Sequence, residues 1–150
     1  MTFLTLAQAK LHCRIDGTDG DADLTIKISA AERAASEYIQ CEIYLTQAAL
    51  TSAISQTSGT LESAKEDYDD AIDEADLLTD ADLIAMEKQQ ALDVYNRAKY
   101  AASRVRNGVV INDLILAAML LIVGWLYEVR EDGEPIPKAA RDLLHPFKSY

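Results

Sequence analysis

Regularly spaced carboxylates are the residues of this chain that could do chemistry. Four aspartates follow one another at steps of 4, 3 and 4 and would share one face of a continuous helix: Asp69, Asp73, Asp76 and Asp80. Carboxylates that point inward from two helices could hold Mg²⁺ for nucleotide hydrolysis. Here Tyr68, Ile72 and Ala75 mark an opposite, apolar face, so the carboxylates are predicted to face water. A magnesium-dependent nucleotide pyrophosphohydrolase remains the enzymatic alternative.

A second acidic segment, "DGTDGDAD" at residues 16–23, raises the question of a calcium loop. The EF-hand loop needs a glycine at its sixth position and a bidentate glutamate at its twelfth. Aligning these aspartates with the ligand positions puts Leu24 and Ala30 there instead. The segment therefore predicts a turn, after which Asp21 or Asp23 caps the next helix.

The remaining reactive side chains form no recognisable set. His12, His145, Cys13 and Cys41 show no metal-ligand spacing, and two adjacent residues point to different sides of a helix. The chain also lacks a glycine-rich phosphate loop and a serine-nucleophile motif. The sequence therefore predicts no catalytic residue, no cofactor and no metal site.

Length and charge limit the classes of protein to consider. A chain of 150 residues fits one domain, and 14 basic against 25 acidic residues give a net charge of −11. Such a chain repels phosphate, so a stand-alone nucleic-acid binder is disfavoured. Residues 46–100 carry most of the acidity, with twelve acids against four bases. The first residues lack a secretory signal pattern, so synthesis in a cytoplasm is expected.

Hydrophobic periodicity predicts an all-α fold, a small helical bundle. Thr5 is expected to cap a first short helix, and residues 41–58 stay ambiguous between a short strand and a helix. The other expected helical elements are a helix over 22–40, an acidic αα-hairpin over about 60–105, a central apolar helix over about 112–131 and a short helix over 138–144. We expect one domain over 1–150, with 46–105 as an acidic helical insertion and 138–150 as a C-terminal arm.

The apolar helix needs a cover on all sides. Residues 114–127 carry no charge, yet 14 residues span only about 21 Å, too short for a membrane core of about 30 Å. A helix that is apolar all round is either enclosed by its own chain or enclosed in part and completed by a neighbouring subunit. The sequence alone favours the first arrangement, because central core helices are common.

Three segments, taken in order, resemble a known family. They are residues 4–39, residues 111–132 ("INDLILAAMLLIVGWLYEVRED") and residues 136–150 ("IPKAARDLLHPFKSY"). Together they resemble the head–tail connector, or head-completion, proteins of long-tailed double-stranded-DNA phages. Residues 46–105 depart from the short, partly β middle of the better-known members of that family.

The resemblance implies a structural subunit of the phage neck, in a ring expected to be twelvefold. The ring would dock on the portal, extend the DNA channel and link head to tail, with no catalysis. The implied partners are other copies of the chain, the portal and the next neck protein. DNA would pass through without specific binding, and no membrane is involved. The implied place is the virion neck, assembled in the cytoplasm of a bacterial host. A helical DNA-packaging or interaction module is a further alternative, disfavoured by the negative charge.

Candidate interface residues lie on the apolar helix and at its end: Leu116, Leu120, Gly124, Trp125, Tyr127, Arg130 and Glu131. Large aromatic residues dominate subunit contacts, so Trp125 and Tyr127 are the expected anchors. Replacing Trp125 by Ala should cost about 3–5 kcal/mol in folding or assembly if that side chain is fully buried. Arg130 and Glu131 could pair between subunits, or Arg130 could simply complement the helix dipole.

The candidate portal-docking arm consists of the C-terminal residues Leu144, Pro146, Phe147, Lys148 and Tyr150. The alternative for this segment is an unstructured chain end.

Overall fold

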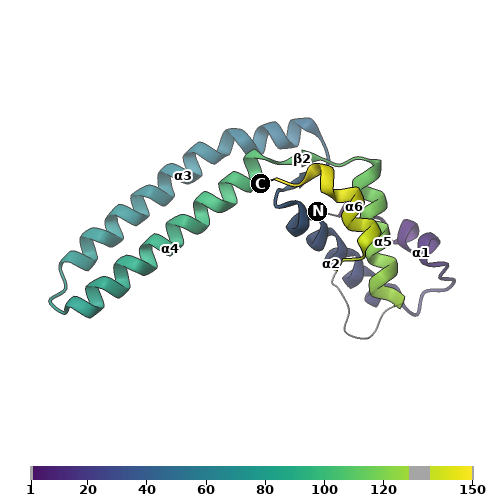
Figure 1. The fold of residues 1–150 in the computed structure, drawn as a ribbon, viewed down its shortest axis with the longest axis horizontal. Coiled ribbons are helices and arrows are strands. Elements are labelled where there is room, and N and C mark those ends of the chain that lie inside the picture. The colour runs from purple at the N-terminus through teal and green to yellow at the C-terminus, as the bar shows by residue number, and fades with distance from the viewer. Residues whose placement is uncertain (1, 129–135, 150) are drawn as a thin grey trace. The chain divides into compact units, whose positions relative to one another are not determined.

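The computed structural model describes residues 2–128 and 136–149, and it is built almost entirely of helices (Figure 1). The elements are α1 (Leu6–Cys13), α2 (Asp21–Ile39), β1 (Ile43–Tyr44), α3 (Gln47–Asp76), α4 (Ala81–Arg106), β2 (Val109–Val110), α5 (Asp113–Glu128), α6 (Lys138–Leu144) and a 3₁₀ turn, η1 (His145–Phe147). The predicted all-α class is confirmed. The last predicted residues of the apolar helix, 129–131, lie outside the described residues.

The chain forms two compact units. The first comprises Met1–Thr46 and Val109–Tyr150, and the second comprises Gln47–Gly108. In the first unit α5 contacts α1, α2 and α6. Its core is made of side chains that are almost completely removed from water, the largest of which are Leu4, Leu24, Ile39, Ile115, Met119, Ile122 and Leu144. The second unit is the pair of antiparallel helices α3 and α4, which lie side by side along their length (Figure 1).

Two short strands join the parts of the first unit on either side of the hairpin. β1 pairs in parallel with β2, in the register Ile43 with Val109 and Tyr44 with Val110. Parallel strands need a long crossover connection, and the 62 residues 47–108 supply it here. The ambiguity at residues 41–58 is thus resolved into a strand followed by a helix. A two-residue strand is defined by its hydrogen bonds to a partner strand. The sequence of β2 alone therefore does not predict it.

Helix starts use side-chain caps in three places, of which Thr5 was predicted, and depart from the prediction at α2. Thr5 and Gln8 form a capping box on α1, Asp80 caps α4, and the Asn112 side chain accepts hydrogen bonds from the first amides of α5. The predicted aspartate cap of α2 is wrong, because Gly20 takes that position without a side-chain hydrogen bond. Asp21 instead accepts a hydrogen bond from Lys10 Nζ at 2.6 Å, which ties α1 to α2.

The acidic hairpin begins earlier than predicted, at Gln47 rather than near residue 60. The first three turns are rich in Ser and Thr, which are weak helix formers and hide the helix in a sequence pattern. The hydroxyls of Ser55, Thr57 and Thr60 are satisfied by carbonyl oxygens one turn back in the same helix. Leu50 and Thr57 are buried, so packing rather than propensity holds this part of α3.

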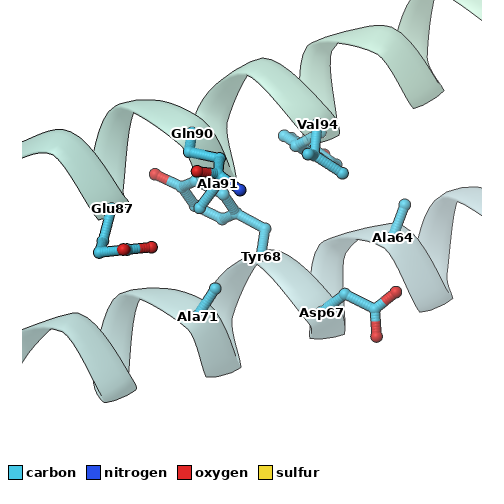
Figure 2. A pocket seen from close by; sticks show the side chains of 9 residues that line it. Ala64, Asp67, Tyr68, Ala71, Glu87, Gln90, Ala91 and Val94 are labelled. Carbon is cyan, nitrogen blue, oxygen red and sulfur yellow. The ribbon is translucent and has the colours of Figure 1, made fainter.

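Small residues let α3 and α4 approach closely, and one aromatic pair spans the gap. The rings of Tyr68 and Tyr95 stack with centroids 5.4 Å apart. Figure 2 shows the Tyr68 side chain reaching from α3 toward Gln90 and Ala91 of α4. An open pocket remains beside it, lined by three alanines, Val94 and both tyrosines together with Asp67, Glu87 and Gln90. Most side chains of α3 and α4 are exposed to water.

Candidate functional site

The apolar helix α5 is fully covered by its own chain on one face and only partly covered on the others. The buried face consists of Ile115, Ala118, Met119, Ile122 and Val123. On the remaining sides, Ala117 is exposed, Leu114 is 49% exposed and Tyr127 is 40% exposed. The sequence left open whether the chain itself encloses this helix fully or only in part. The described residues of the subunit enclose it only in part.

The predicted interface residues fall into three groups. Leu116 and Leu120 are half-buried and pack against the core of their own unit. Gly124 and Trp125 are also half-buried, and Tyr127 is exposed. Arg130 and Glu131 lie outside the described residues. Tyr127 is therefore the residue of this set that the described subunit leaves most exposed.

Trp125 lines an open pocket on the first unit. The pocket is formed by α1, α5 and the start of α6, through His12, Leu121, Gly124, Trp125, Pro137 and Ala139. Its walls are mainly apolar, with Glu128 at one edge. Burial raises the pKa of the nearby Cys13 thiol, and the charge of Glu128 raises it further. That thiol therefore stays protonated at neutral pH, which makes it a poor nucleophile.

Gly124 leaves room for His12 beside the pocket. A β-carbon built on Gly124 would lie 3.3 Å from His12 Nε2, a tight contact with an exposed side chain that is free to turn away. Replacing Gly124 by Ala should therefore keep or raise the free energy of unfolding, by up to about 1 kcal/mol, because alanine favours the helix. Urea denaturation measures this. Gly59 in α3 has open space around it, so Gly59→Ala reports the helix-propensity gain alone.

A loss of more than about 1 kcal/mol in Gly124→Ala would contradict this prediction, because the cost would exceed what a turning histidine accounts for. Normal stability combined with lost self-association would instead mark Gly124 as a close-contact position between subunits.

The carboxylates of the hairpin are exposed, as predicted, and do not converge. Asp69 pairs with Lys65, which raises the pKa of that lysine. Asp76 pairs with Lys88 of α4 at 2.5 Å, and Asp80 accepts hydrogen bonds from the amides of Asp82 and Leu83. Within residues 2–128 and 136–149, no three His, Cys, Asp or Glu side chains are placed to hold a metal ion. The aspartates make ion pairs and a helix cap rather than a catalytic cluster.

The C-terminal arm lies against α2 in the described residues. Leu144 is fully buried in the core, and Phe147 packs on it from a half-buried position. The Ser149 amide donates a hydrogen bond to the Ile39 carbonyl at 2.8 Å. Lys148 Nζ lies 5.3 Å from the centre of the Tyr38 ring. Pro146 is exposed, whereas Tyr150 lies outside the described residues.

One exposed apolar cluster was missed by the sequence analysis. It lies at the turn between α3 and α4 and consists of Leu77, Leu78, Leu83 and Met86. Helical periodicity assigns no face to Leu77 and Leu78, which lie in the turn, and it does not show that Leu83 and Met86 of α4 stay uncovered. The signal that could have revealed it is the pair of adjacent leucines in an otherwise acidic turn.

A family comparison decides the assignment. The family described as phage gp6-like head–tail connector protein matches residues 3–146, nearly the whole chain and including the hairpin. The chain belongs to this family. No curated protein and no solved structure gives a significant match. The connector is therefore a structural component of a phage virion at the junction of head and tail, and membership implies no enzymatic role. None of its described helices is long and apolar enough to cross a membrane.

Proposed function

We propose that this connector forms a closed ring of identical subunits, expected to be twelvefold, in the neck of the virion. The ring docks on the portal, extends the DNA channel and presents a platform to the next neck protein. Residues 46–105 act as an insertion into a single connector domain. Assembly takes place in the cytoplasm of the bacterial host.

The observation that carries this proposal is the incomplete cover of α5. Apolar surface next to water is unfavourable by roughly 25 cal/mol per Å², so the partly covered side of this helix needs a partner. In a ring, each subunit contacts its two neighbours through two different surfaces. The side of α5 with Leu121, Gly124 and Trp125 is one of these surfaces, and its pocket accepts a side chain of the neighbouring subunit. Arg130 and Glu131 extend this surface.

Charge supports the role of a channel. A net charge of −11 makes the protein repel DNA, which suits a duct through which DNA slides without sticking. No specific contact with DNA is part of the proposal.

The portal contact is assigned to the C-terminal arm. Because Leu144 is already used in the core of its own subunit, its part is to hold the arm in place. Pro146, Phe147 and Lys148 then form the contacting surface, with Tyr150 at the end of the chain.

The test is the mass of the full chain in solution, alone and mixed with purified portal rings, by mass photometry and negative-stain microscopy. Rings, or a complex with the portal that contains several copies of the chain, are expected. A chain that stays monomeric at high concentration and never joins portal rings would overturn the proposal.

A further inference from the structure

The turn of the hairpin presents four large apolar side chains to water. Within ten residues, Leu77 is 82% exposed, Leu78 41%, Leu83 45% and Met86 56%, and we call this set the tip surface. In Figure 1 it lies at the left end of the α3–α4 pair, where the two helices meet in a tight turn. Single exposed leucines are normal on proteins, but several at one end of a long helical hairpin mark a contact site.

The turn that carries the tip surface is well held. The amides of Leu77 and Leu78 donate to carbonyl oxygens of the last turn of α3 at 3.2 and 3.1 Å. Asp80 caps α4, and the ion pair of Lys88 with Asp76 bridges the two helices just behind the turn. A preorganised apolar surface loses little conformational entropy when it binds. Most of the free energy gained by burying its area is therefore available for affinity.

The surroundings of the tip surface are strongly acidic. Residues 62–93 carry twelve acids and only two bases, Lys65 and Lys88, and both of these bases pair with aspartates of the hairpin. The rest of the hairpin differs, since residues 47–61 carry no charge and residues 94–108 carry four bases and no acid. The negative charge is thus concentrated on the half of the hairpin that ends in the tip surface.

This negative charge limits the kind of partner that the tip surface can bind. DNA and anionic lipid surfaces are repelled by so many carboxylates. The tip surface of a second copy carries the same charge and is repelled as well. A protein surface with an apolar pocket rimmed by Lys and Arg complements both the leucines and the acidic surroundings.

We propose that the tip surface docks into such a basic-rimmed apolar pocket on a second protein of the neck. This proposal rests on the proposed neck function for where the partner is found, but not for the chemistry of the contact. The hairpin then holds these apolar side chains in contact with the neighbouring protein.

The test compares two double variants of the full chain for binding to purified portal rings and to the purified tail-side neck protein of the same phage. Leu77→Ser/Leu83→Ser removes half of the tip surface. Leu92→Ser/Val94→Ser is the matched control, because it removes two exposed apolar side chains from the same hairpin, away from the turn. Circular dichroism checks that both variants stay folded.

We expect the tip variant to bind one of the two proteins about tenfold more weakly or worse, while the control stays within about twofold of the unmodified chain. That binding should also weaken as NaCl rises from about 0.05 to about 0.5 M. The proposal is overturned if the chain binds neither protein, or if the tip variant binds both as the unmodified chain does. It is also overturned if the tip variant changes only self-association, or only binding to duplex DNA or anionic vesicles.

If the proposed neck function itself is wrong, the experiment gives a different result. In that case the unmodified chain forms no ring and joins no portal. If rings form and the tip variant binds both proteins as the unmodified chain does, only the docking proposal falls.

Discussion

Replacing Trp125 by Ala is expected to abolish ring formation while leaving the subunit folded. Trp125 is half-buried in the single subunit and lines an open pocket, so its removal should lower the free energy of unfolding by less than the 3–5 kcal/mol of a fully buried tryptophan. A tryptophan in the middle of a subunit interface typically contributes 2 kcal/mol or more, about a 30-fold effect on each contact. Mass photometry at several concentrations measures the loss of rings, and urea denaturation measures the stability.

Tyr100→Ala is the control for this prediction, because it removes an exposed aromatic residue from the hairpin and leaves α5 untouched. It should keep the rings. Intact rings in Trp125→Ala at all concentrations would show that the interface lies elsewhere on the subunit. A large loss of stability would show instead that Trp125 belongs to the core.

Ile122→Ala should have the largest effect on folding, lowering the free energy of unfolding by about 2–5 kcal/mol. Ile122 is completely buried in the core formed by α5 and its neighbours, so the deletion removes apolar contacts and leaves a cavity. Leu114→Ala on the same helix is the matched control. Leu114 is 49% exposed, so its truncation should cost no more than about 0.5 kcal/mol in the single subunit.

Chemical denaturation at a concentration where the chain is monomeric gives both values. Equal costs for Ile122→Ala and Leu114→Ala would contradict the one-sided burial of α5. A small cost for Leu114→Ala in the monomer, together with weaker self-association, would place Leu114 in the subunit interface with Trp125.

The two sides of α5 explain why the sequence was ambiguous about this helix. Ile115 and Ile122 face the core, whereas Leu114 and Leu121 lie toward the other side, yet all four are aliphatic. Hydrophobic periodicity separates apolar from polar faces, and it cannot separate an apolar face that meets its own chain from one that meets a partner. The helix and its cap at Asn112 were therefore predictable, but its orientation was not.

The acidic hairpin shows a different limit. The break near residue 80, the Asp80 cap and the exposed aspartates follow from local pattern, and all are found in the structure. The start of α3 was left open within residues 41–58, because its Ser- and Thr-rich turns are held by packing at Leu50 and Thr57, which no local propensity reports. The exposed leucines of the turn were missed because exposure depends on what packs nearby.

By itself the sequence determined the class of fold, the helices with a strong apolar period, the helix caps and the resemblance of both ends of the chain to phage connectors, which the family match confirms. These properties depend on residues close together in the chain, or on motifs in a fixed order. Only the tertiary structure decided which side of α5 is covered, that β1 and β2 pair in parallel across the hairpin, and that Leu144 lies in the core while Trp125 and Leu77 stay available to partners. These properties depend on contacts between residues far apart in the chain, and a one-dimensional pattern does not encode such contacts.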